Sequence, residues 1–249
     1  MKKLSILISY LILIFPSNLA FAQDILKIAE AKATKRDTKT FNIVSLDGKN
    51  EKVTITPDYL KRVLRMTCLK DTINIPDFWD VTPELHILNK SFIEIKYEVR
   101  GGSNLGLGNT LILCVNGSML YEAMHVLRYT NWDSGDIKTN YQIKLIMVGN
   151  SKSNYKLNVG IHDDVYSKPN PEKNYTYNNQ TVLSFDTRQN AFYSIKEGVY
   201  KHFIPKTGKT AKQKVDGNFP VIILGKETYY FINNRWYQPG ISNEMYEMQ

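Results

Sequence analysis

The sequence predicts a mainly β fold: an antiparallel β-sandwich with one short packing helix at about residues 57–67 and a small C-terminal β-hairpin unit. Three observations support this prediction. Apolar and polar residues alternate in several runs after residue 91, short turn sequences separate these runs, and one segment has a convincing helical pattern. Hairpins that follow one another along a chain favour antiparallel sheets.

The N-terminus has the three-part pattern of a secretory signal peptide. Lys2 and Lys3 precede an apolar run at residues 4–15, and Ala20 and Ala22 supply a small-x-small cleavage site. We interpret residues 1–22 as a signal peptide, because the apolar run falls short of the ~20 residues needed to span a bilayer. The expected location is the periplasm, the outer cell surface or the exterior of a bacterial cell, and no transmembrane segment is expected after residue 22.

Length and charge limit the organisation and the partners. The chain has 249 residues and a formal charge of +8, which falls to +6 without the two lysines of residues 1–22. We divide it into a β-sandwich-like domain at 23–166, a loop or linker at 167–180 and a small β-rich unit at 181–249. The length allows either two separate units or one domain in which the small unit packs on the first. The basic residues are spread along the chain, so a solvated surface is favoured and no nucleic-acid partner is expected.

The first elements lie before residue 68. Residues 24–36 form a short helix or a frayed leader, and two β-rich runs flank the turn at Asp47 and Gly48. The packing helix is predicted to begin with Thr56 as cap, Pro57 in the first turn and Asp58 at the positive end of the dipole. Its apolar side would comprise Leu60, Val63, Leu64 and Thr67.

Strands dominate the chain from residue 91. Ile93, Ile95, Tyr97 and Val99 alternate with charged residues, and the uniformly apolar run at 110–115 is typical of a central strand. Between them, Gly101, Gly106 and Gly108 suggest a phosphate-binding loop, but a strand rather than a helix follows. We therefore interpret this stretch as a strand connection. Further hairpins are predicted at 141–161, 191–204 and 228–238.

Two cysteines allow one disulfide. Joining Cys68 to Cys114 would close a loop of about 46 residues and contribute about 4 kcal/mol in the chain-entropy model. The alternative is two separate thiols, because Cys114 lies in an apolar run where a free cysteine packs well. Both interpretations stay open at this stage.

A polar turn at residues 131–136 is a candidate cation site. Asp133 and Asp136 could supply oxygen ligands to calcium beside the ring of Trp132. An Asp-Gly turn between strands needs no metal, and this interpretation is favoured. No other cofactor is expected.

His162, Asp163 and Asp164 stand together at the end of a predicted strand. An imidazole beside two carboxylates could serve acid–base chemistry. This trio, or the turn at Asp133 and Asp136, supports the alternative function of a secreted hydrolase, although a polar strand end is the simpler interpretation.

Aromatic residues gather in the last hairpin and carry the leading functional hypothesis. Alternation places its rings on both faces of a sheet, so some are expected to be exposed and able to stack on sugar rings or on a protein. The candidate ligand-binding residues are Tyr229, Tyr230, Trp236, Tyr237 and Trp132. We therefore expect an exported, non-catalytic binding or envelope-associated module for a glycan or protein partner.

Overall fold

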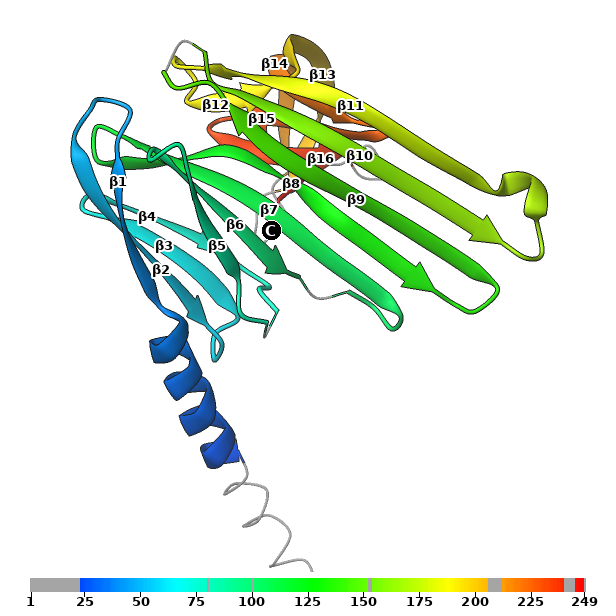
Figure 1. Ribbon diagram of the computed structural model, residues 1–249, viewed down its shortest axis with the longest axis horizontal. Helices are drawn as coiled ribbons and strands as arrows, with labels where there is room; N and C mark the ends of the chain where they lie inside the picture. Colours follow the sequence, from blue (N-terminus) through cyan, green and yellow to red (C-terminus); the bar gives the residue numbers. More distant parts are fainter. Residues whose placement is uncertain are drawn as a thin grey trace, which may run out of the picture.

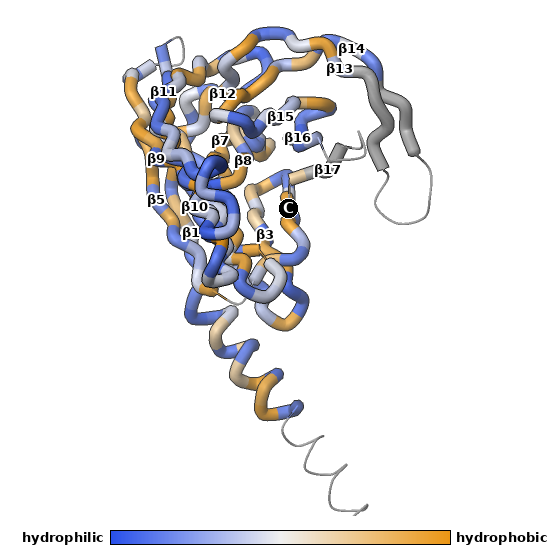
Figure 2. Tube along the Cα trace, turned by 90° about the vertical axis from the view of Figure 1, so that its right-hand side faces the viewer, coloured by the Kyte–Doolittle hydropathy of each residue, from blue (hydrophilic) through white to orange (hydrophobic). Residues whose placement is uncertain are grey.

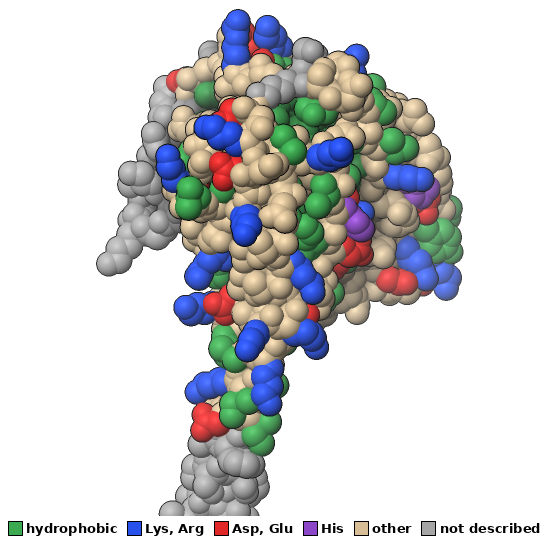
Figure 3. Space-filling model, turned by 60° about the vertical axis from the view of Figure 1, so that its left-hand side comes forward, with side chains coloured by type: hydrophobic (Ala, Val, Ile, Leu, Met, Phe, Trp, Pro, Cys, Tyr) green, Lys and Arg blue, Asp and Glu red, His purple; other side chains and the backbone are tan. Residues whose placement is uncertain are grey.

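The described residues form an α-helix, a short 3-10 helix and three antiparallel sheets. The computed structural model describes residues 23–79, 81–99, 101–151, 154–205, 212–239 and 245–248, so the predicted signal peptide lies outside the described residues. Residues 23–37 form the α-helix, which projects away from the β body (Figures 1 and 3). In the described part of the chain, no helix has the length and apolar character to cross a membrane.

The N-terminal sheet is a four-stranded meander. Its strands, in spatial as in chain order, are β1 (Lys39–Val44), β2 (Asn50–Asp58), β3 (Val63–Cys68) and β4 (Asp71–Ile75). Each strand pairs antiparallel with the next one along the chain.

The central sheet has eight strands and is also a meander. It runs from β5 (Glu84–Leu88), β6 (Phe92–Glu98), β7 (Leu105–Asn116) and β8 (Met119–Asp133) to β9 (Ile137–Val148), β10 (Lys156–Ser167), β11 (Tyr175–Asp186) and β12 (Ala191–Tyr193). A short 3-10 helix, η1 (Pro171–Lys173), joins β10 to β11. Figure 1 shows the long strands β7–β11 lying side by side.

The C-terminal sheet has five strands in chain order. They are β13 (Ile195–Pro205), β14 (Lys212–Leu224), β15 (Glu227–Ile232), β16 (Arg235–Pro239) and β17 (Met245–Glu247). Figures 1 and 2 both show this sheet at the end of the body far from the helix, with the N-terminal sheet nearer to the helix.

Two cores hold the sheets together, one on each face of the strands β6 and β7. On one face, Ile93, Ile95 and Leu111 pack against the N-terminal sheet. On the other face, Phe92 and Ile112 belong to a core shared with β9–β12 and with the C-terminal sheet. The alternation seen in the sequence after residue 91 therefore separates two buried faces here, because sheets cover both sides of these strands.

The mainly β, sandwich-like fold is confirmed, but the helix predicted at 57–67 is not formed. These residues belong to β2, a turn and β3. Buried residues alternate through β2, at Val53, Ile55 and Pro57, and the turn places Arg62 at a positive φ of 52°. Pro57 lies beyond Ile55, the last β2 residue to pair with β1, so the strand accommodates a residue without an N–H group. The helix of this chain instead occupies 23–37.

Cys68 and Cys114 are both free thiols. The side chain of Cys114 lies in the core shared with the C-terminal sheet, whereas Cys68 packs at the edge of the core under the N-terminal sheet. The two side chains are thus on opposite faces of the central sheet, which prevents a disulfide. Burial raises the pKa of the Cys114 thiol, so it acts as a small apolar side chain.

The boundary that the sequence predicts at 167–180 falls between two paired strands of the central sheet. Residues 175–180 form the first half of β11 and pair with β10 from Gly160 to Val165. The shared core contains residues from both sides of this boundary, such as Leu157 and Trp236. A polar, proline-containing stretch can still form a strand here, because β11 pairs through its backbone while its side chains there stay exposed.

Candidate functional site

A hollow of about 600 Å³ opens around Gly160 on β9, β10 and β11. The strands alternate strictly in this region: Ile143 and Ile161 are turned to the core side, and their neighbours in sequence are turned outward. We call the outward side of these three strands the outer face. The residues that line the hollow are Gln142, Ile143, Lys144, Gly160, Ile161, His162, Asn178, Asn179 and Gln180.

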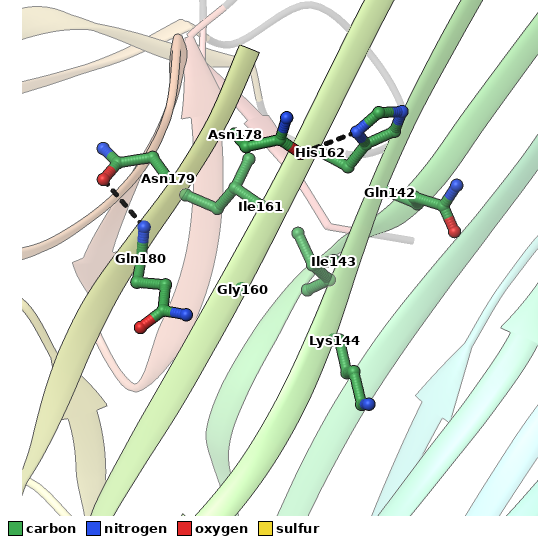
Figure 4. A pocket seen from close by; sticks show the side chains of 9 residues that line it. All are labelled: Gln142, Ile143, Lys144, Gly160, Ile161, His162, Asn178, Asn179 and Gln180. Atoms are coloured by element: carbon green, nitrogen blue, oxygen red, sulfur yellow. Dashed lines mark hydrogen bonds between the residues drawn. The ribbon is translucent and has the colours of Figure 1, made fainter. Parts of the chain in front are cut away.

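Strand register places the polar side chains of the hollow in two rows. Gly160 lies opposite Lys144 on one side and Gln180 on the other, and His162 lies between Gln142 and Asn178. Figure 4 shows the β9 side chains and the β11 side chain of Gln180 on either side of Gly160. Rows on one face of a strand are about 7 Å apart and neighbouring strands about 4.8 Å apart, so these groups cover an area comparable with one or two sugar rings.

Gly160 creates the hollow by its missing side chain. A Cβ atom at this position would meet a single heavy atom within 4 Å, the backbone oxygen of Lys144 at 3.9 Å. The backbone of Gly160 is not in the left-handed region. Its glycine therefore serves neither a turn nor a tight contact, and the space above it is open to a ligand.

Hydrogen bonds fix one end of the hollow, and apolar residues bound the other. His162 Nδ1 and Asn178 Oδ1 are 2.8 Å apart, and Thr176 Oγ1 donates to Asp164 Oδ1 at 2.7 Å. Next to the row of Gly160, Ile146 and Val182 are about half exposed on the same face. The hollow thus offers amides, an imidazole and an ammonium group beside an apolar rim.

The predicted trio of His162, Asp163 and Asp164 does not converge. His162 and Asp164 belong to the outer face, whereas Asp163 is buried on the core side. Lys226 Nζ lies 2.8 Å from Asp163 Oδ2, and Tyr175 Oη donates to the same oxygen at 2.9 Å. Burial disfavours the charge of Lys226, but its bonds to Asp163 and Tyr175 outweigh this and raise its pKa. Asp163 is therefore held in a structural ion pair between the central and C-terminal sheets.

The aromatic hairpin packs mainly inward. Tyr229 and Trp236 are fully buried in the shared core, while Tyr230 and Tyr237 are half-buried beside a smaller cluster around Tyr200 and Ile232. Trp236 Nε1 donates to the backbone oxygen of Glu122 at 3.0 Å. Burial raises the pKa of Tyr229 well above its usual value. Because core packing occupies Tyr229 and Trp236, we do not include them in the proposed contact surface.

The predicted cation turn forms the tip of the β8–β9 hairpin. Asp133 and Asp136 are exposed and each lies near a lysine: Asp133 is 3.0 Å from Lys138, and Asp136 is 3.6 Å from Lys168. The Gly135 N–H donates to Asp133 at 2.7 Å, and this bond, with Lys138, lowers the pKa of Asp133. Trp132 is half-buried on β8. Within the described residues, no group of three or more His, Cys, Asp or Glu side chains could hold a metal ion.

Most residues of the hollow were missed at the sequence level. The available signal was Gly160, which interrupts an alternating strand, together with amide side chains at alternate positions 142, 178 and 180. Their convergence depends on the pairing of β10 with both β9 and β11, and the sequence predicts only the first of these pairings, as the hairpin at 141–161.

Comparison with protein-family models, with curated proteins and with solved structures gave no match to this chain. The functional argument therefore rests on the chemistry of the hollow.

Proposed function

We propose that this chain is an exported, non-catalytic module that binds a glycan through the hollow around Gly160. The observation that carries the proposal is an open glycine floor ringed by Gln142, Lys144, His162 and Gln180 on one rigid sheet. Export is proposed from the pattern of residues 1–22 alone.

The chemistry of the hollow favours a sugar. Amide groups both donate and accept hydrogen bonds, as sugar hydroxyl groups do, and the apolar rim of Ile146 and Val182 suits the C–H face of a sugar ring. A volume of about 600 Å³ also lies within the range of small-molecule sites. A protein partner would bury about 800 Å² on each side, contributed by roughly 20–30 residues. Nine residues line the hollow, which suits a smaller ligand.

The same chemistry favours binding over hydrolysis. Glycosidases use a pair of carboxyl groups on either side of the scissile bond. No carboxylate is among the residues that line the hollow, and the nearest carboxylate along β10 on the same face, Asp164, is bonded to Thr176. His162 is engaged with Asn178.

A side chain placed at Gly160 tests the proposal. We expect the wild-type protein to bind at least one ligand on a glycan array, and Gly160→Leu to lose at least about tenfold in affinity because its side chain fills the hollow. The substitution should preserve or raise the melting temperature, since leucine suits a strand better than glycine and its Cβ would meet only the backbone oxygen of Lys144, at 3.9 Å.

Ser184→Leu is the matched control, because Ser184 is exposed on the same face of β11 but does not line the hollow. Its affinity should stay within about twofold of the wild type. A blank array with folded protein, or equal binding by Gly160→Leu, would contradict the proposal.

A further inference from the structure

A second, smaller pocket adjoins the hollow where β9 leaves β8. The two strands pair from Tyr129 to Asp133 and from Lys138 to Gln142, and the pocket of about 250 Å³ lies just beyond these pairs. Its lining residues are Glu94, Lys96, Thr110, Arg128, Ile143, Lys144 and Leu145. Ile143 and Lys144 also line the hollow, so the two spaces share a wall.

The charged groups of this pocket leave basic donors unused. Lys96 Nζ is 3.5 Å from Glu94 and 3.8 Å from Glu84, so the carboxylate of Glu94 has a cationic partner. In the described part of the chain, Arg128 donates one side-chain hydrogen bond, from Nη2 to Glu98 Oε1 at 3.1 Å. Lys144 makes no ion pair with any residue that the structure describes.

Two buried polar atoms at the pocket have no hydrogen-bond partner among the residues that the structure describes: Thr110 Oγ1 and Arg128 Nε. Thr110 is fully buried, and the β-bulge between Gly108 and Asn109 brings Arg128 to the same wall. An unpaired buried polar group destabilises the fold, so native proteins rarely retain one without a partner such as water or an ion.

We propose that this pocket binds an oxyanion group, a carboxylate or a sulfate, carried by an acidic sugar whose ring occupies the hollow. The unused groups, the Lys144 ammonium, the Arg128 Nε–H and the Thr110 hydroxyl, are all donors, and oxyanions are the ligands that accept from such a set. Lys144 lines both the hollow and the pocket, so it is placed to contact a ligand that occupies both. This inference rests on the proposed glycan-binding function and adds the class of glycan.

Inorganic sulfate tests the pocket without a glycan. We expect millimolar sulfate to raise the melting temperature of the wild type more than chloride does at equal ionic strength, because the folded state alone has the pocket. Thr110→Val removes the hydroxyl with little change of shape, so it should keep or raise the melting temperature without sulfate. It should lose most of the sulfate-dependent shift.

Lys144→Gln should also lose most of the shift. Lys156→Gln is its matched control, because Lys156 is an exposed lysine on the same face of β10 and lies outside both spaces. The general stabilising effect of sulfate acts equally on all variants, so the difference between them isolates the pocket. Equal shifts in the wild type, Thr110→Val and Lys144→Gln would overturn the proposal.

Uronate-containing and sulfated oligosaccharides, compared with neutral ones, separate this inference from the proposed function. We expect the acidic ligands to bind at least about tenfold more tightly to the wild type and to lose this preference in Thr110→Val. Neutral and acidic sugars that bind equally would refute the oxyanion pocket and leave glycan binding intact. A specific sulfate shift with no glycan binding would support the pocket and refute the proposed function.

Discussion

At the scale of single residues, the glycines of this chain have different roles. Gly160 leaves space above the outer face, whereas Gly108 lies under the ring of Tyr129. Tyr129 is held there by a hydrogen bond from its hydroxyl to Glu98, and Arg128 lies over its ring at 4.7 Å. Burial and this bond to Glu98 raise the pKa of Tyr129 to about 12, so its hydroxyl stays protonated and able to donate.

Gly108→Ala should therefore destabilise the protein. The added Cβ would lie 2.4 Å from Tyr129 Cε1, and the bond to Glu98 prevents the ring from moving freely. We expect a loss of about 1–3 kcal/mol in the free energy of unfolding, measured with urea. Gly102→Ala is the control, since its Cβ would meet nothing within 4 Å, and should change stability by less than about 0.5 kcal/mol. Equal stability of the two variants would contradict the role of Gly108.

Residue patterns predict which positions share a face but not which face is covered. The alternation in the last hairpin was visible in the sequence, yet the burial of Tyr229 and Trp236 follows from docking onto β8. The candidate site could not be predicted from the sequence, because it too depends on how strands meet in space. Lys144, Gly160 and Gln180 are far apart in sequence and become neighbours through strand register. The sequence places His162 in a candidate catalytic trio with Asp163 and Asp164. In the structure its neighbours on the adjacent strands are instead the amide side chains of Gln142 and Asn178.

At the scale of elements, local signals and tertiary packing disagree at residues 57–67. Thr56, Pro57 and Asp58 fit a helix start, and they fit equally the end of a strand before a turn. Packing decides, because β2 and β3 bury Ile55, Leu64 and Met66 under the central sheet. The antiparallel order of the meanders was predictable, since short turns join most neighbouring strands.

The helix at 23–37 is attached to the body mainly at its C-terminal end. Asp37 is buried there and accepts hydrogen bonds from Arg36, from Tyr59 Oη at 2.8 Å and from Thr82 Oγ1 at 3.1 Å. The Tyr59 N–H also donates to Thr34 Oγ1 at 3.2 Å. The hydrogen bonds from Arg36, together with those from Tyr59 and Thr82, hold the pKa of Asp37 well below its usual range.

The attachment of this helix should weaken in acid. A carboxyl group with a lowered folded-state pKa stabilises the fold above its unfolded pKa, about 3.9, and this contribution is lost as the pH falls toward the folded-state value. We expect the amide signals of residues 34–37, followed by NMR, to shift toward unattached values below about pH 4. In Asp37→Asn they should be shifted already at pH 7 and change little with pH.

Asp24→Asn is the control for this element, since Asp24 is exposed and forms an ion pair with Lys27, at 3.6 Å. This variant should keep the wild-type pH response. A response that survives in Asp37→Asn would mean that another group controls the attachment.

At the scale of the whole molecule, the shared core joins the central and C-terminal sheets. Trp236 Nε1 and the backbone N–H of Leu127 each make a hydrogen bond across the two sheets, to Glu122 O and to Tyr229 Oη respectively. Arg235 also forms an ion pair with the buried side chain of Glu122. The apolar side chains that meet in this core are covered by packing against one another, so the two sheets are expected to unfold together.

We therefore expect one unfolding transition in calorimetry, coincident with loss of far-UV and near-UV circular dichroism. Trp236→Ala should lower the stability of this single transition by about 3–5 kcal/mol, because it empties a fully buried position in the shared core. Val199→Thr, at a side chain 68% exposed on β13, is the control and should change it by less than about 0.5 kcal/mol. Two separate transitions, with Trp236→Ala moving only one, would instead identify the C-terminal sheet as an independent unit, as a boundary at residues 167–180 requires.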